Sequence, residues 1–180
     1  MLRLGRPAAL ATALVALFGA GVRASDHPQD ALKLILRDSP GGQKTVYVTR
    51  VPTIVLPQDQ PFIVGASFTI TAQSGETATF DMPADNWTGN TSATLYKFTN
   101  RVAPLGPSPV KLAIIKDGSA LKVTAKACGI TLDEPSQGSI SVMLTIGSDR
   151  YCSTCSGLGV SADEPGRFIA RGCAAAPCAP

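Results

Sequence analysis

The sequence predicts an all-β protein, and three observations support this prediction. Apolar and polar residues alternate with a period of two in several segments, turn-forming residues separate these segments, and no segment after the first residues shows the apolar stripe of an amphipathic helix. Strands with one apolar face must cover that face with another sheet or by closing on themselves. We therefore expect an antiparallel β-sandwich of roughly nine or ten strands with hairpin connections, with a β-barrel as the alternative.

The alternating segments carry their apolar residues two positions apart. These apolar sets are Leu32, Leu34 and Leu36; Phe68, Ile70 and Ala72; Ala78, Phe80 and Met82; Leu121, Val123 and Ala125; and Ile140, Val142, Leu144 and Ile146. The residues between them are mostly Ser, Thr, Asp, Lys or Arg. Such segments are typical of strands with one face in the core and one face in water.

Turn chemistry separates the predicted strands. Clusters rich in Gly, Pro, Ser and Asp occupy residues 38–42, 73–76 and 147–149. The Asp117-Gly118 pair supplies the positive φ angles of a tight hairpin, so residues 110–116 and 119–127 are expected to pair antiparallel. Two stretches rich in Pro, 101–109 and 172–180, read as connections, because proline donates no hydrogen bond within a sheet.

Residues 1–24 are typical of a secretory signal peptide. Arg3 and Arg6 precede an apolar run over residues 8–20, and cleavage is expected near Ala24. The apolar run is too short for a membrane span, which needs about 20 residues. We therefore expect a protein that is secreted, periplasmic or extracellular, with a single β-domain over residues 25–171 and an Ala/Pro-rich tail that bears cysteines over residues 172–180.

The charge balance changes when the signal peptide is removed. The precursor has 16 Lys and Arg against 13 Asp and Glu, and Arg3, Arg6 and Arg23 leave with the signal peptide. The mature chain is then formally neutral, which argues against a nucleic-acid partner because such proteins need a basic patch. No cofactor is expected, and the expected partner is an extracellular protein or polysaccharide.

The cysteines allow three interpretations. Cys152-x-x-Cys155 follows a predicted strand rather than opening a helix, which argues against a redox motif. Together with Cys173 and Cys178 it would supply four thiolates for zinc, although exported proteins usually oxidise such thiols. We favour disulfides, with Cys152 joined to Cys178, and with Cys128 either free or joined to Cys155.

Two segments hold candidate site residues, one around Trp87 and one around His27. Trp87, Tyr96 and Asn86 are candidates for a platform on which sugar rings stack, although a lone Trp in a β-domain more often packs in the core. His27 is the only histidine and lies beside the expected cleavage point, where a chain end is usually mobile. Hydrolases that use a Ser-His-Asp or Cys-His set are therefore not expected.

No catalytic or metal-binding set is predicted. A glycoside hydrolase needs only two carboxylates, and Asp81, Asp85, Asp133 and Glu134 are available. All four lie in or near predicted turns, where a solvated surface role is the usual one.

The chain resembles a group of exported bacterial β-domains to which no established activity is attached. The resemblance is carried by Trp87, Tyr96-Lys97-Phe98, Asp117-Gly118, Leu121-Lys122-Val123, Gln137-Gly138-Ser139, Leu144-Thr145, Arg150-Tyr151-Cys152, Gly166-Arg167-Phe168 and Pro177-Cys178. Similar sequences carry a further cysteine pair on the strands beside the Asp-Gly turn, where this chain has Pro109 and Ala125. Cys128 and Cys155 are additions, so no disulfide map is carried over.

These observations favour an exported structural or interaction β-domain whose ligand the sequence does not name. The first alternative is a carbohydrate-binding module that uses Trp87. The second is a glycoside hydrolase that uses two carboxylates.

Overall fold

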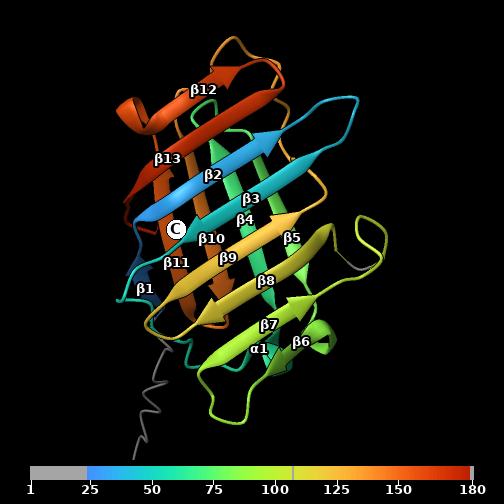
Figure 1. The fold of residues 1–180 in the computed structure, drawn as a ribbon, viewed down its shortest axis with the longest axis vertical. Coiled ribbons are helices and arrows are strands. Elements are labelled where there is room, and N and C mark those ends of the chain that lie inside the picture. Colours follow the sequence, from blue (N-terminus) through green and yellow to red (C-terminus); the bar gives the residue numbers. More distant parts are fainter. Residues whose placement is uncertain (1–23, 107, 179–180) are drawn as a thin grey trace, which may run out of the picture.

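The protein is a single, mainly antiparallel sheet that curls into a half-barrel (Figure 1). The computed structural model describes residues 24–106 and 108–178. The predicted signal peptide lies outside these residues, apart from Ala24. The all-β prediction is confirmed, and the sheet contains 13 strands, more than the nine or ten expected, because short edge strands lack the alternation that identifies longer ones.

The curled sheet brings its two halves face to face as two layers, whose strands cross in Figure 1. The back layer contains β5 (Thr77–Met82), β4 (Ala66–Ala72), β10 (Ile140–Ile146), β11 (Asp149–Cys155) and β1 (Ser25–Pro28). The front layer contains β12 (Val160–Glu164), β13 (Arg167–Ala175), β2 (Ala31–Arg37), β3 (Lys44–Thr49), β9 (Ala120–Ala125), β8 (Val110–Lys116), β7 (Leu95–Thr99) and β6 (Trp87–Gly89). A helical turn α1 (Pro61–Val64) and two 3-10 turns, η1 (Ala84–Asn86) and η2 (Gly157–Gly159), lie between strands.

The core lies between the two layers. Its buried members alternate along the strands: Leu34, Leu36, Tyr47, Phe98, Val123 and Phe168 in the front layer, and Phe68, Ile70, Val142, Leu144 and Tyr151 in the back layer. Leu32, predicted to share the apolar face of Leu34 and Leu36, is 55% exposed, so the prediction was wrong for this residue. The ring centroids of Tyr47 on β3 and Phe68 on β4 lie 5.7 Å apart, so the two side chains are in contact between the layers. The Asp117-Gly118 hairpin joins β8 to β9 as expected.

The C-terminal segment differs from the prediction. Strand β13 runs to Ala175, so residues 172–175 belong to the sheet and not to a connecting tail. Its first part pairs with β2, and then Ala174 and Ala175 pair with Thr154 and Ser153 of β11. This crossing makes the two layers one sheet. The prediction of a connecting segment was therefore wrong for residues 172–175. Their small side chains give no apolar alternation in the sequence, and two disulfides hold the segment in place in the fold.

The N-terminal segment is also ordered, contrary to the prediction. Strand β1 pairs in parallel with β11, with Ser25 opposite Asp149 and Pro28 opposite Cys152. Both described ends of the chain therefore attach to β11. Among the described residues, no helix is long and apolar enough to cross a membrane.

Candidate functional site

The cysteines form two disulfides. Cys152 is joined to Cys178, the pair favoured from the sequence, and Cys155 is joined to Cys173. Cys128 is free and fully buried. A four-thiolate zinc site and a Cys128–Cys155 bridge are both wrong, because the sulfurs they need are already bonded. No group of three or more potential metal ligands occurs within the described residues.

The aromatic residues of the predicted sugar platform are largely buried. Trp87 is 4% exposed and its indole N–H donates to the carbonyl of Met82, 3.2 Å away. Tyr96 is 5% exposed, and the Trp87 ring packs against Phe98. The side-chain amide of Asn86 donates to the carbonyl of Thr99. Both aromatic rings are therefore largely packed in the core, but Trp87 and Tyr96 still line a surface pocket of about 500 Å³, so the platform stays a prediction.

His27 is held in place, contrary to the expectation of a mobile end. Its Nε2 lies 2.8 Å from Oδ1 of Asp149, which is 1% exposed, and its ring stacks on Tyr151 with 4.8 Å between ring centroids. The other carboxylate oxygen of Asp149 accepts the backbone N–H of Gln58. The His27–Asp149 contact and the Tyr151 stacking fasten β1 to β11.

The four candidate carboxylates of a hydrolase lie in three different segments. Asp81 is on β5, Asp85 is in η1, and Asp133 and Glu134 are in the connection before β10. Within the described residues, Asp133 accepts the hydroxyl of Thr131 and Glu134 accepts the amide of Gln137. No interaction described for these residues pairs one carboxylate with another.

Burial and hydrogen bonds shift several pKa values. Burial raises the pKa of Tyr47 to about 12 against the lowering effect of its hydrogen bond with Ser153, and burial also raises the pKa of the Cys128 thiol to about 12. The pKa of Tyr151 rises as well, through burial and the nearby charge of Asp149. For Asp163, burial raises the pKa, but hydrogen bonds from Ser136, Gln137 and Gly138 together hold it below its ordinary value. Tyr47, Cys128 and Tyr151 thus keep their protons at neutral pH, whereas Asp163 is stabilised as a carboxylate.

The outer face of the back layer carries three rows of registered side chains. The first row is Thr77, Thr71, Ser141 and Thr154; the second is Thr79, Thr69, Met143 and Cys152; the third is Asp81, Ser67, Thr145 and Arg150. Side chains point outward here because their neighbours along each strand fill the core. Hydroxyl groups therefore cover most of this face.

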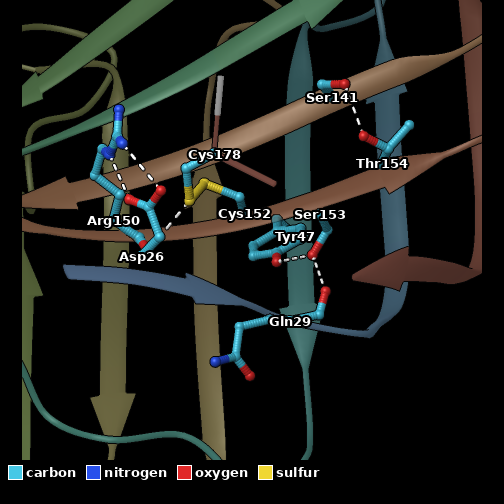
Figure 2. The surroundings of a disulfide bond; sticks show 9 residues. All are labelled: Asp26, Gln29, Tyr47, Ser141, Arg150, Cys152, Ser153, Thr154 and Cys178. Atoms are coloured by element: carbon cyan, nitrogen blue, oxygen red, sulfur yellow. Dashed lines mark hydrogen bonds and ion pairs between the residues drawn. A yellow bond between two sulfur atoms is a disulfide. The ribbon is translucent and has the colours of Figure 1, made fainter. Parts of the chain in front are cut away.

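A cleft lies over these rows beside the Cys152–Cys178 disulfide, and we call it the hydroxyl cleft. Its volume is about 390 Å³, and its polar side chains are Thr69, Thr71, Thr77, Ser141 and Thr154. Met143 lies among them, and Ala176 and Pro177 form one wall. The disulfide fixes this wall, since Cys178 follows Pro177 directly. Figure 2 shows the disulfide, the Ser141–Thr154 pair and the neighbouring Arg150–Asp26 ion pair.

The hydroxyl groups of the cleft are paired. Thr77 donates to Thr71 over 3.2 Å, Ser141 and Thr154 are 2.8 Å apart, and Thr69 and Thr79 are 3.1 Å apart. A hydroxyl has one donor and two acceptor sites, so each pair uses one O–H and leaves the other for a ligand. No lining residue is charged. The cleft thus offers hydrogen bonds of both kinds to a neutral polar molecule.

The sequence shows part of the pattern that produces the hydroxyl cleft. The polar positions of the alternating segments are largely Ser and Thr, as in Thr69-Ile70-Thr71 and Thr77-Ala78-Thr79. Alternation places these side chains on a wet face, but it does not give the pairing of β4 with β10 or the register of their side chains. Those relations, and the wall formed by Pro177, depend on contacts distant in sequence.

Comparison with known proteins gives no relative: no protein-family model, curated protein or solved structure matches the chain.

Proposed function

We propose that the protein is an exported interaction β-domain that binds an uncharged, hydroxyl-rich ligand, such as a strand of neutral polysaccharide, in the hydroxyl cleft. Export is supported by the signal-like residues 1–24 and by two disulfides, which persist in oxidising compartments. The resemblance to exported bacterial β-domains points to the same location.

The observation that carries the proposal is the set of paired hydroxyls beside a covalently fixed wall. Protein sites for small ligands combine apolar contact with a few placed polar groups. Here Met143 and Pro177 supply apolar contact for the C–H face of a sugar, and the free O–H of each hydroxyl pair supplies a donor. Because two disulfides hold the surrounding strands, little ordering is needed on binding.

Binding can be measured by affinity electrophoresis of the chain from Ser25 in gels that contain dextran, xylan or a soluble β-glucan. We expect retardation in at least one gel. The double variant Thr71→Val, Ser141→Ala removes two hydroxyls, each contributing about 0.5–1.5 kcal/mol, and is expected to weaken binding about tenfold.

Ser161→Ala is the matched control, because Ser161 is an exposed strand hydroxyl on β12, outside the cleft. It is expected to leave retardation unchanged. The proposal would be overturned if none of the neutral polysaccharides retarded the protein. It would also be overturned if the double variant were retarded as strongly as the unchanged protein.

A further inference from the structure

Positive charge is concentrated on the front layer, although the mature chain is formally neutral. The front-layer strands contain Lys33, Arg37, Lys44, Lys97, Lys111, Lys116, Lys122, Arg167 and Arg171, against the acids Asp163 and Glu164. The back-layer strands contain Asp26, Asp81 and Asp149 against Arg150. A chain of zero formal net charge can therefore still present a basic face, and neutrality does not exclude an anionic partner at this surface.

Strand register aligns these cations in rows. Arg171 lies opposite Lys33, Lys33 opposite Val48, Val48 opposite Lys122, Lys122 opposite Ile114, and Ile114 opposite Lys97. We call Arg171, Lys33, Lys122 and Lys97 the basic row. They lie on the outer face, the one turned toward the viewer in Figure 1, because their strand neighbours Leu34, Val123 and Phe98 are buried.

Three cations of the basic row are evenly spaced, and the fourth, Arg171, lies directly beside Lys33 on the neighbouring strand. Neighbouring strands lie about 4.8 Å apart, so Lys33, Lys122 and Lys97, on every second strand, are separated by about 10 Å each. Val48 and Ile114 occupy the strands between them. A second row, Arg167, Arg37 and Lys44, lies four residues farther along the strands.

The basic row is not neutralised by the protein. Arg167 of the second row pairs with Glu164 at 2.6 Å, but within the described residues no ion pair involves Lys33, Lys97, Lys122 or Arg171. Asp163 faces Ser136, Gln137 and Gly138 instead. Four cations in line on one face create a positive potential that attracts an extended anion.

We propose that this face binds a linear carboxylated polysaccharide laid along the basic row. A chain with one carboxylate per one or two sugars presents separated charges with C–H surfaces between them. The basic row presents the complementary pattern of cations separated by Val48 and Ile114. This surface lies on the opposite layer from the hydroxyl cleft, so the two proposals are independent.

Two other partners fit the face less well. Single-stranded nucleic acids are held by aromatic side chains that stack on bases, and the rows contain no aromatic residue. A bilayer requires apolar side chains that protrude, whereas Val48 and Ile114 are shorter than the lysines beside them.

The probe is polygalacturonate, and binding to the chain from Ser25 is measured by isothermal titration calorimetry. We expect binding that weakens at least tenfold between about 50 and about 200 mM NaCl, because contacts between exposed charges are screened by salt. Dextran of similar length should not compete. The triple variant Lys33→Gln, Lys97→Gln, Lys122→Gln is expected to lose at least tenfold in affinity.

Two variants that each remove one positive charge separate the effect of position in the row from the effect of net charge on binding. Lys122→Gln takes one cation from the centre of the row, and Arg101→Gln takes one from an exposed turn outside the rows. The first is expected to weaken binding severalfold and the second less than twofold. Far-ultraviolet circular dichroism and urea midpoints confirm that each variant is folded.

Three results would overturn this proposal: no binding to polygalacturonate at low salt, equal losses for Lys122→Gln and Arg101→Gln, or tighter binding to single-stranded DNA or to anionic phospholipid vesicles than to the polysaccharide. Variants of the hydroxyl cleft are expected to leave this binding unchanged, which keeps the two tests separate.

Discussion

Nε2 of His27 lies 2.8 Å from Oδ1 of Asp149, and this contact joins the first described strand to a carboxylate that is 1% exposed. A carboxylate in such a place needs its hydrogen-bond partners, because a buried charge without them is costly. Asp149 has two partners, the imidazole and the N–H of Gln58. The attachment of β1 therefore protects a buried acid of β11.

Replacing His27 with Ala removes one of these partners. We expect His27→Ala to lower the free energy of unfolding by about 1–3 kcal/mol, the usual cost of leaving a buried polar group unpaired. Urea unfolding of the chain from Ser25 measures the change. Asp26→Asn is the control, because the Asp26–Arg150 ion pair is more exposed and is expected to contribute less than about 1 kcal/mol. A larger loss for Asp26→Asn than for His27→Ala would show that His27 does not protect Asp149.

Cys128 is expected to be unreactive in the folded protein. It is fully buried, and burial together with the nearby charge of Asp38 raises its pKa to about 12, so the reactive thiolate is scarce at neutral pH. A maleimide reagent followed by mass spectrometry should add no label to the native chain and one label in denaturant. Cys128→Ala should add none in either condition. Labelling of more than one cysteine in unreduced, denatured protein would contradict the two disulfides.

Stability is expected to fall at alkaline pH through Tyr47. Its pKa is about 12 in the folded chain and 10.0 as the unperturbed value. The raised pKa means that the folded state keeps the Tyr47 proton up to a higher pH than the unfolded state does. The resulting contribution of Tyr47 to the free energy of unfolding is therefore complete below about pH 10 and is lost as the pH rises toward 12. Urea midpoints at several alkaline pH values measure the decline.

The comparison for this decline uses Tyr47→Phe in a Cys128→Ala background, because the buried thiol would otherwise contribute in the same pH range. Tyr47→Phe is expected to make the decline shallower without abolishing it, since the pKa of Tyr151 is also raised. If Tyr47→Phe leaves the decline of the urea midpoint with pH unchanged, the pKa of Tyr47 is not raised in the folded protein.

The long strands could be predicted from the sequence because each carries its own signal. In β10, Ile140, Val142, Leu144 and Ile146 are all buried, as the alternation indicated. The Asp117-Gly118 turn likewise specifies a hairpin between neighbouring segments. These relations are local, so a single sequence is sufficient to read them.

The two surfaces proposed for binding could not be predicted, because they depend on register between strands far apart in the chain. Lys33 and Lys122 are aligned because both lie opposite Val48 on the strand between them, and no local sequence pattern in these three strands predicts that pairing. The same holds for β1, whose four residues show no alternation and are ordered by Asp149, 122 residues from His27. The sequence left open whether the lone Trp87 is exposed or packed in the core, because its neighbours in space were unknown.

Gly129 gives a test of how the connection before β10 packs against the edge strand β5. A Cβ at this position would lie 2.6 Å from the Phe80 ring and 2.8 Å from Cβ of Ala78, and the residue has a φ of +90°. Both the overlap and the backbone angle disfavour any side chain. We expect Gly129→Ala to lower the free energy of unfolding by about 2 kcal/mol or more, while Gly41→Ala, which meets nothing within 4 Å, changes it by less than about 0.5 kcal/mol. Equal urea midpoints for the two variants would mean that the connection does not pack against β5.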